Sequence, residues 1–196
     1  YSEHLVLDDG RIKSSGYNAS SGFGLRAISA EAYAYALSNE ISEHRLKEAA
    51  DSVRPIKLSP ARSAYLPVIG KSKQLYTDQN PLSLVSFEQK VDLMGKIDAY
   101  ARSKDPRVSQ VSASLGGEWQ VVKIIGTDGR EASDIRPLVR FNVSIVAKQN
   151  GRMESGSYGL GGRYLYDSFF KENVWKFAVD EALRQALVNL ESVPAP

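Results

Sequence analysis

The chain has 196 residues, 42% of them hydrophobic and 24% charged, which is an ordinary balance for a globular protein with a buried core. Its 25 basic and 23 acidic residues give a net charge of +2 and form no long runs. Direct action on nucleic acid, or on an anionic membrane, is therefore not expected, because the sequence carries no basic stripe with interleaved aromatic residues.

The sequence contains no cysteine, which excludes disulfides, thiolate metal sites and a cysteine nucleophile and favours a cytoplasmic location. No apolar run approaches the roughly 20 residues that cross a bilayer, and no basic-then-apolar leader opens the chain. We expect both ends, Tyr1 and Pro196, to be cuts through a longer protein.

The first segment alternates between apolar and polar residues from about residue 3 to residue 37 and predicts an antiparallel meander. An Asp9-Gly10 pair between two strand-like runs indicates a hairpin. Ser42 then follows as a helix N-cap, with a helix to about Val53. That helix is expected to bury Leu46, Ala49, Ala50 and Val53 against the sheet.

Residues 55–83 carry four of the eight prolines and predict an extended crossing loop. Ser86 and Gln89 form a capping box for a helix that ends before Pro106. A second antiparallel set follows, with turns at residues 127–130 and 150–151, and an amphipathic helix is expected over residues 172–191.

These elements predict an α+β fold, with amphipathic helices packed on one face of a mainly antiparallel sheet. We expect a single domain over residues 1–196, made of a first half (1–54), the crossing loop (55–83) and a second half (84–196). Both halves contain an Asp-Gly-Arg turn followed by strands and a helix, which indicates an internal duplication. The alternative is that Asp-Gly turns recur in any meander.

The sequence offers little for catalysis. His4 and His44 are the only histidines, and a zinc site needs three or four ligands. His44 and Glu48 share a helix face, but an ordinary solvated polar face explains them better. Asp8 and Asp9 are interpreted as turn residues, because adjacent strand residues point to opposite faces. We therefore predict no metal bound by this chain alone.

A glycine-rich tract contains Gly156, Gly159, Gly161 and Gly162 and ends at Arg163. It lacks the Gly-Lys-Ser or Gly-Lys-Thr end of a phosphate-binding loop and the setting of a dinucleotide loop. Two interpretations stay open. The tract is a flexible loop or bulged strand end, or its small residues let the backbone of a substrate or partner approach.

The segment from Arg136 to Tyr166 resembles the TldD/PmbA family of metallopeptidases, also called modulators of DNA gyrase, and is most similar to the TldD branch. The resemblance extends over residues 107–196 and more loosely over 5–53, and it includes the sequences at 136–140, 154–156, 161–163 and 186–190. The candidate contacts to substrate or partner that follow are Arg136, Arg140, Glu154, Gly156, Gly159, Gly161, Gly162 and Arg163.

The resemblance implies a zinc-dependent peptidase of the bacterial cytosol that processes short or unfolded peptides. A catalytic TldD-like subunit and a PmbA-like partner would enclose a chamber. The family's His-Glu-x-x-x-His zinc motif is expected beyond the end of this chain, in a C-terminal catalytic domain. No matched residue is a zinc ligand, so this N-terminal part is expected to be inactive by itself.

Two rival functions remain. The chain is a stand-alone peptide-binding or protein-interaction module that adds an extended peptide to its sheet edge, or it is a DNA-associated regulator of gyrase. The second rival predicts binding that weakens steeply with salt.

Overall fold

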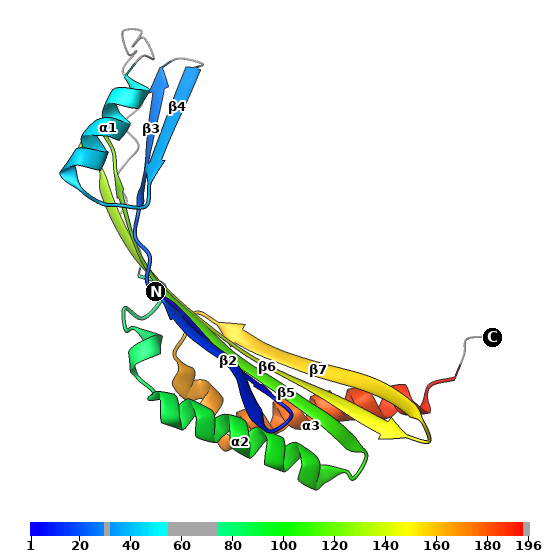
Figure 1. Cartoon of the computed structure of the whole chain (residues 1–196). Helices are drawn as coiled ribbons and strands as arrows, with labels where there is room; N and C mark the ends of the chain where they lie inside the picture. The colour runs from blue at the N-terminus through cyan, green and yellow to red at the C-terminus, as the bar shows by residue number, and fades with distance from the viewer. Residues whose placement is uncertain (30–31, 55–73, 194–196) are drawn as a thin grey trace. The chain divides into compact units, whose positions relative to one another are not determined.

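The computed structural model describes residues 1–29, 32–54 and 74–193, which belong to two compact units (Figure 1). The larger unit contains Tyr1–Asn18, Lys73–Ile124 and Glu131–Pro196, and the smaller contains Ala19–Ser72 and Ile125–Arg130. Most of the predicted crossing loop lies outside the described residues, and its final part forms a short 3-10 helix, Pro81–Ser83.

The larger unit is built on a five-stranded sheet in the order β2-β1-β5-β6-β7. Its strands are β1 (Ser2–Asp8), β2 (Arg11–Asn18), β5 (Val108–Ile125), β6 (Glu131–Gln149) and β7 (Arg152–Gly162). β1 pairs antiparallel with both β2 and β5, and β6 pairs antiparallel with β7. The first residues of the chain thus lie beside strands more than 100 residues away in sequence.

Two tight turns in this sheet use the left-handed backbone that their sequences predict. Asp9 and Gly10 have φ of 51° and 76°, and Asn150 and Gly151 have φ of 51° and 79°. Positive φ at both central positions is the geometry of a type I′ hairpin, which Asp-Gly and Asn-Gly adopt at low cost. Both predicted hairpins are confirmed.

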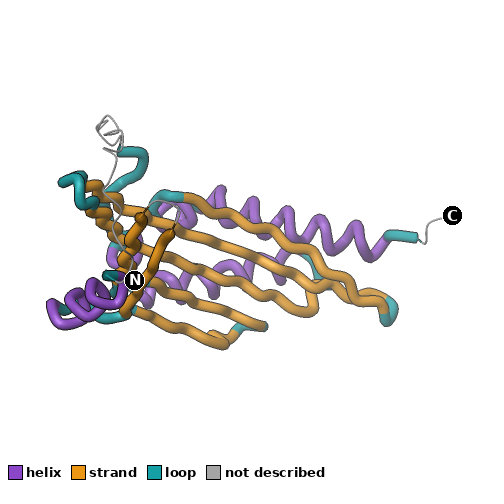
Figure 2. Tube along the Cα trace, turned by 90° about the horizontal axis from the view of Figure 1, so that it is seen from above, coloured by secondary structure: helices purple, strands orange, loops and turns teal. Residues whose placement is uncertain are grey.

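Helices α2 (Phe87–Lys104) and α3 (Glu172–Glu191) pack on one face of the five-stranded sheet (Figure 2). The predicted capping box of α2 is present, since Ser86 accepts from the amide of Gln89 and the Gln89 side chain accepts from the amide of Ser86. A 3-10 helix, Tyr166–Phe170, leads into α3. The core between helices and sheet includes Leu5, Met94, Ile97, Val111, Phe141, Val143, Phe169, Trp175 and Val179.

The smaller unit has a two-stranded antiparallel sheet, β3 (Phe23–Ser29) and β4 (Ala32–Ser38), and helix α1 (Glu43–Val53). Ser42 caps α1 as predicted. The expected burial of Leu46 and Ala50 is wrong: both are exposed, and Ala49 is the buried residue of this helix. The sheet beside α1 has only two strands, so it covers few of the helix side chains.

The predicted α+β class is confirmed, but the expectation of one meander over residues 3–37 is wrong. β1 and β2 belong to the five-stranded sheet, whereas β3 and β4 form a separate pair. The reason is the burial of Leu5 and Leu7, which lie in register with Leu115 and Ala113 of β5. None of the helices in the described ranges is long and apolar enough to cross a membrane.

Candidate functional site

The face of the five-stranded sheet opposite α2 and α3 carries mostly small and polar side chains. Successive strand residues point to opposite faces, so the residues between the buried core positions of β5 and β6 form this open face. Cross-strand pairing extends the pattern to β1 and β7. The open face includes Asp8, Gln110, Ser112, Ser114, Gly116, Arg140, Asn142, Ser144, Ser155, Ser157, Gly159 and Gly161.

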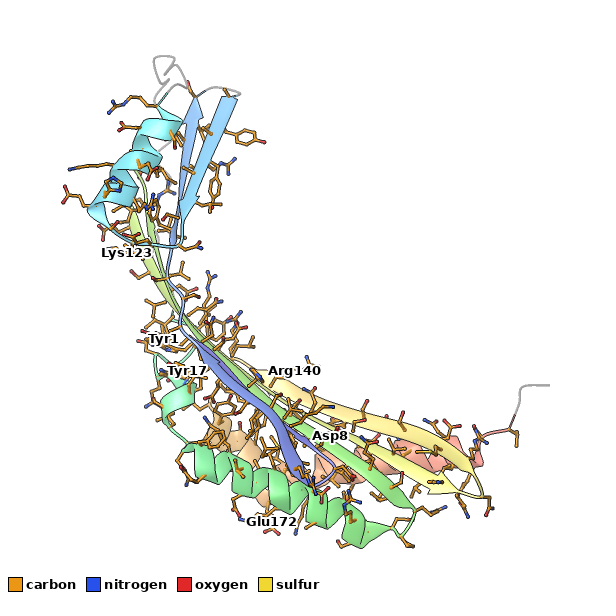
Figure 3. All side chains as sticks on the ribbon, viewed as in Figure 1. Tyr1, Asp8, Tyr17, Lys123, Arg140 and Glu172 are labelled. Atoms are coloured by element: carbon orange, nitrogen blue, oxygen red, sulfur yellow. The ribbon has the colours of Figure 1, made fainter. Side chains whose placement is uncertain are left out.

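Arg140, labelled in Figure 3, begins a short hydrogen-bonded chain on the open face that has Asn142 at its centre. Its Nε donates to Oδ1 of Asn142 at 3.0 Å, and Nδ2 of Asn142 donates to Oγ of Ser114 on β5 at 3.2 Å. Gly159 and Gly161 pair with Asn142 and Arg140 on the neighbouring strand. A Cβ at Gly159 would lie 2.7 Å from Oδ1 of Asn142, so this glycine makes room for the amide. Three of the predicted contact residues therefore lie together.

Asp8 forms a second polar cluster on the same face. Its carboxylate accepts hydrogen bonds from Oγ of Ser112 at 2.6 Å, Nε2 of Gln110 at 2.9 Å and Nζ of Lys13 at 3.0 Å. These three donors lower the pKa of Asp8 to about 2. Sequence reasoning missed this residue because it placed both Asp8 and Asp9 in the turn, and only the pairing of β1 with β5 brings the donors to Asp8.

The other predicted charged residues are engaged locally. Arg136 donates to Asp134 at 2.5 Å, and Glu154 accepts from Arg152 at 2.9 Å. Arg163 donates to the carbonyl of Pro137 at 3.4 Å and lies 5.4 Å from the ring centre of Tyr76. These residues do not join the chain around Arg140.

Two glycines of the tract are placed by packing. Gly156 is buried, and a Cβ there would lie 2.2 Å from the carbonyl oxygen of Ala182 and 2.5 Å from the amide nitrogen of Ala186 in α3. At Gly162 the nearest atoms belong to the ring of Tyr164. The tract is part of strand β7 rather than a loop, and Gly156 serves the close approach of β7 to α3.

The described ranges contain no group of three or more His, Asp or Glu side chains that could hold a metal ion. His44 is exposed, and the neighbouring Glu48 pairs with Arg45 at 2.7 Å. The residues present therefore do not fit a metal centre.

The larger unit is an antiparallel sheet with helices on one face and a polar open face on the other. Two family models match the chain: the PmbA/TldA metallopeptidase domain 1 over residues 1–54 and the PmbA/TldA metallopeptidase central domain over residues 80–190. The chain belongs to the PmbA/TldD family of metallopeptidases, and the predicted resemblance is confirmed.

Two curated relatives that cover nearly the whole chain carry the TldD name. A metalloprotease TldD homolog from Haemophilus influenzae is 39% identical over 206 residues, which cover 99% of this chain and 42% of that protein. A TldD homolog from Buchnera aphidicola (subsp. Schizaphis graminum) is 35% identical over 201 residues, which cover 99% of this chain and 42% of that protein. The chain thus spans about two fifths of the length of the curated relatives it matches.

Solved structures share the fold. TldE from Thermococcus kodakarensis matches with a TM-score of 0.71 at 15% identity, over 95% of this chain and 42% of that chain. A Thermotoga maritima protein described as a candidate modulator of a DNA gyrase matches with a TM-score of 0.73 at 17% identity, over 100% of this chain and 44% of that chain.

Proposed function

We propose that this chain is the scaffold and substrate-chamber part of a TldD-like zinc metallopeptidase that processes short or unfolded peptides. The observation that carries the proposal is the open face of the five-stranded sheet, which no helix of the larger unit covers within the described residues. Membership of the metallopeptidase family supplies the class of reaction.

The chemistry of the open face suits an extended peptide of varied sequence. Glycines and serines leave the strand backbone accessible, and the amide of Asn142 and the hydroxyls of Ser144 and Ser157 offer both donors and acceptors. Such groups bind a peptide main chain without selecting for particular side chains. Arg140 is an exposed cation of this surface and is proposed to contact carbonyl or carboxylate groups of the substrate.

The catalytic centre is proposed to lie outside these 196 residues. The sequence has only two histidines and no His-Glu-x-x-x-His pattern, and the residues described here do not fit a metal site. The zinc ligands would come from a C-terminal catalytic domain, and the assembly would include a PmbA-like partner subunit in the cytoplasm. A structural neighbour named TldE is consistent with such a partner.

The proposal predicts that a bulky side chain on the open face obstructs substrate. Ser157→Trp in the full-length protein, assembled with its partner, should lower kcat/KM for an unfolded peptide by about tenfold, which is the loss expected from about 1.4 kcal/mol of poorer transition-state binding. Circular dichroism and urea unfolding would verify that the variant folds.

The matched control is Asn173→Trp, since Asn173 is also an exposed polar residue but lies on α3, away from the open face. The control should leave kcat/KM unchanged. Equal rates for wild type and Ser157→Trp would contradict the role of the open face.

A further inference from the structure

Strand β2 forms one edge of the five-stranded sheet, and its two halves differ in character. β1 pairs with one side of β2, and among the residues described no strand pairs with the other. The half from Arg11 to Lys13 contains two basic residues and lies at a register shift between Val6 and Leu7 of β1. Charges and bulges of this kind protect an edge from pairing with other chains. The half from Ser14 to Asn18 has regular register and no charged residue, so it is open to pairing.

A pocket of about 240 Å³ lies beside this uncharged half. It lies where β1, β2 and β5 meet the first turn of α2, and its walls include Ser15, Tyr17, Phe87, Lys90, Leu115 and Tyr166. Two of these are aromatic residues with large exposed fractions, 61% for Tyr17 and 53% for Phe87. These two side chains give the pocket an apolar rim that is open to solvent.

The inner wall of the pocket is polar but electrically neutral. Lys90 is 4% exposed, and its ammonium donates to the carboxylate of Glu3 at 2.5 Å and to the carbonyl of Leu82 at 3.3 Å. The same ammonium lies 4.8 Å from the ring centre of Tyr166. The carboxylate of Glu3 therefore offsets the charge of Lys90 in this wall of the pocket.

Tyr166 adds a buried hydroxyl to this wall. The side chain is fully buried, and its hydroxyl has no hydrogen-bond partner of acceptable geometry among the described residues. Burial, with a smaller effect from the Glu3 carboxylate, raises the pKa of Tyr166, so the hydroxyl stays protonated. The protonated hydroxyl adds no charge to this wall of the pocket.

We propose that an extended peptide segment adds as a strand to residues 14–18 of β2 and inserts one uncharged apolar or aromatic side chain into this pocket. The added strand would lie about 4.8 Å from β2, and every second side chain would point toward α2. The uncharged edge supplies main-chain hydrogen bonds, and the neutral pocket with its aromatic rim selects the side chain. The inference rests on the proposed function in that the occupant is of the same class as the proposed substrate.

A second copy of this chain fits the site less well. On the pocket side, the uncharged half of β2 has one apolar residue, Tyr17, which already lines its own pocket. Tyr17 also lies against Tyr1, with ring centres 6.2 Å apart. Pairing of two β2 edges would therefore leave each pocket without a side chain to fill it.

The test uses the isotope-labelled 196-residue chain and the peptide acetyl-Lys-Thr-Leu-Thr-Phe-Thr-Lys-amide as the probe. We expect saturable binding, with backbone amide shift changes concentrated in residues 14–18 and 87–90. The same peptide N-methylated at alternate residues keeps its side chains but loses main-chain donors, and it should bind at least tenfold more weakly.

Phe87→Ala removes one rim aromatic and should weaken binding of the unmodified peptide by about tenfold. Phe177→Ala is the matched control, since Phe177 is a helix residue with a similar exposed fraction, 55%, and packs on Tyr158 of β7 away from the pocket. The Phe177→Ala variant should bind the unmodified peptide as tightly as the wild type does.

The inference is overturned if shift changes map to β7 or the open face, if N-methylation has no effect, or if both phenylalanine variants lose affinity equally. It is also overturned if the chain dimerises through β2 and excludes the peptide. Peptide binding is measured here without cleavage, so its failure leaves the proposed peptidase role standing. An inactive full-length protein would in turn leave the binding result intact.

Discussion

Asp8 illustrates how a single carboxylate links the edge hairpin to the centre of the sheet. It accepts from Lys13 within the β1-β2 hairpin and from Gln110 and Ser112 on β5. All three donors favour the ionised form, so the folded pKa of about 2 lies below the ordinary value of 3.8. The ionised carboxylate therefore stabilises the folded chain above about pH 4, and this contribution is lost as the pH falls from about 4 toward 2.

Replacing Asp8 by an uncharged residue tests this pH dependence of stability. Asp8→Asn should destabilise the chain at pH 7, and the difference from wild type should shrink as the pH is lowered from about 5 to 2. Urea unfolding at a series of pH values measures the difference in free energy of unfolding between the two proteins. Ser112→Ala is the companion variant, since it removes the strongest donor and should raise the pKa of Asp8 in an NMR titration. A difference between Asp8→Asn and wild type that stays constant with pH would refute the explanation.

At the scale of elements, the glycine tract lies in β7 and packs closely on α3. Gly156 allows the strand to approach the helix backbone, and the side chain of Asn189 donates to the carbonyl of Ser155 at 2.9 Å. Arg152 donates to the carbonyls of Asn189 at 2.9 Å and Ser192 at 2.7 Å, which satisfies acceptors at the C-terminal end of α3. One face of the tract thus packs on α3, and the other face belongs to the open face of the sheet.

The element-scale prediction compares two glycines. Gly156→Ala should lower the free energy of unfolding by about 3 kcal/mol, because the new Cβ meets backbone atoms that cannot rotate away. Gly95→Ala in α2 should raise it by about 1 kcal/mol, because no atom lies within 4 Å of that Cβ and alanine favours a helix. Denaturant unfolding measures both. Equal stability of Gly156→Ala and wild type would refute the packing role of Gly156.

The sequence predicted what is local and missed what is long-range. The Ser86 capping box, the Asn150-Gly151 turn and the apolar stripe of α3 depend on residues a few positions apart, so their patterns identified the elements. The pairing of β1 with β5 joins residues about 100 positions apart, and no local pattern encodes it. Arg140, Gly159 and Gly161 became candidates through the family resemblance and the glycine tract. The cluster around Asp8 depends on the pairing of β1 with β5 and was not predicted.

At the scale of the whole molecule, the larger unit separates two surfaces of one sheet. The face toward α2 and α3 is apolar and holds the unit together, and within the described residues no helix of this unit covers the open face. We propose that this surface lines a chamber in the longer protein, while the edge at β2 holds an extended segment. In this view the 196 residues position a peptide and do not cleave it.

The most direct test measures zinc content and peptidase activity of two preparations side by side, the 196-residue chain and the full-length protein with its partner subunit. We predict stoichiometric zinc and chelator-sensitive cleavage of unfolded peptides in the full-length assembly, and neither in the 196-residue chain. Zinc and cleavage in the 196-residue chain after repurification would contradict the scaffold role. A full-length assembly without zinc or activity would contradict the proposed peptidase.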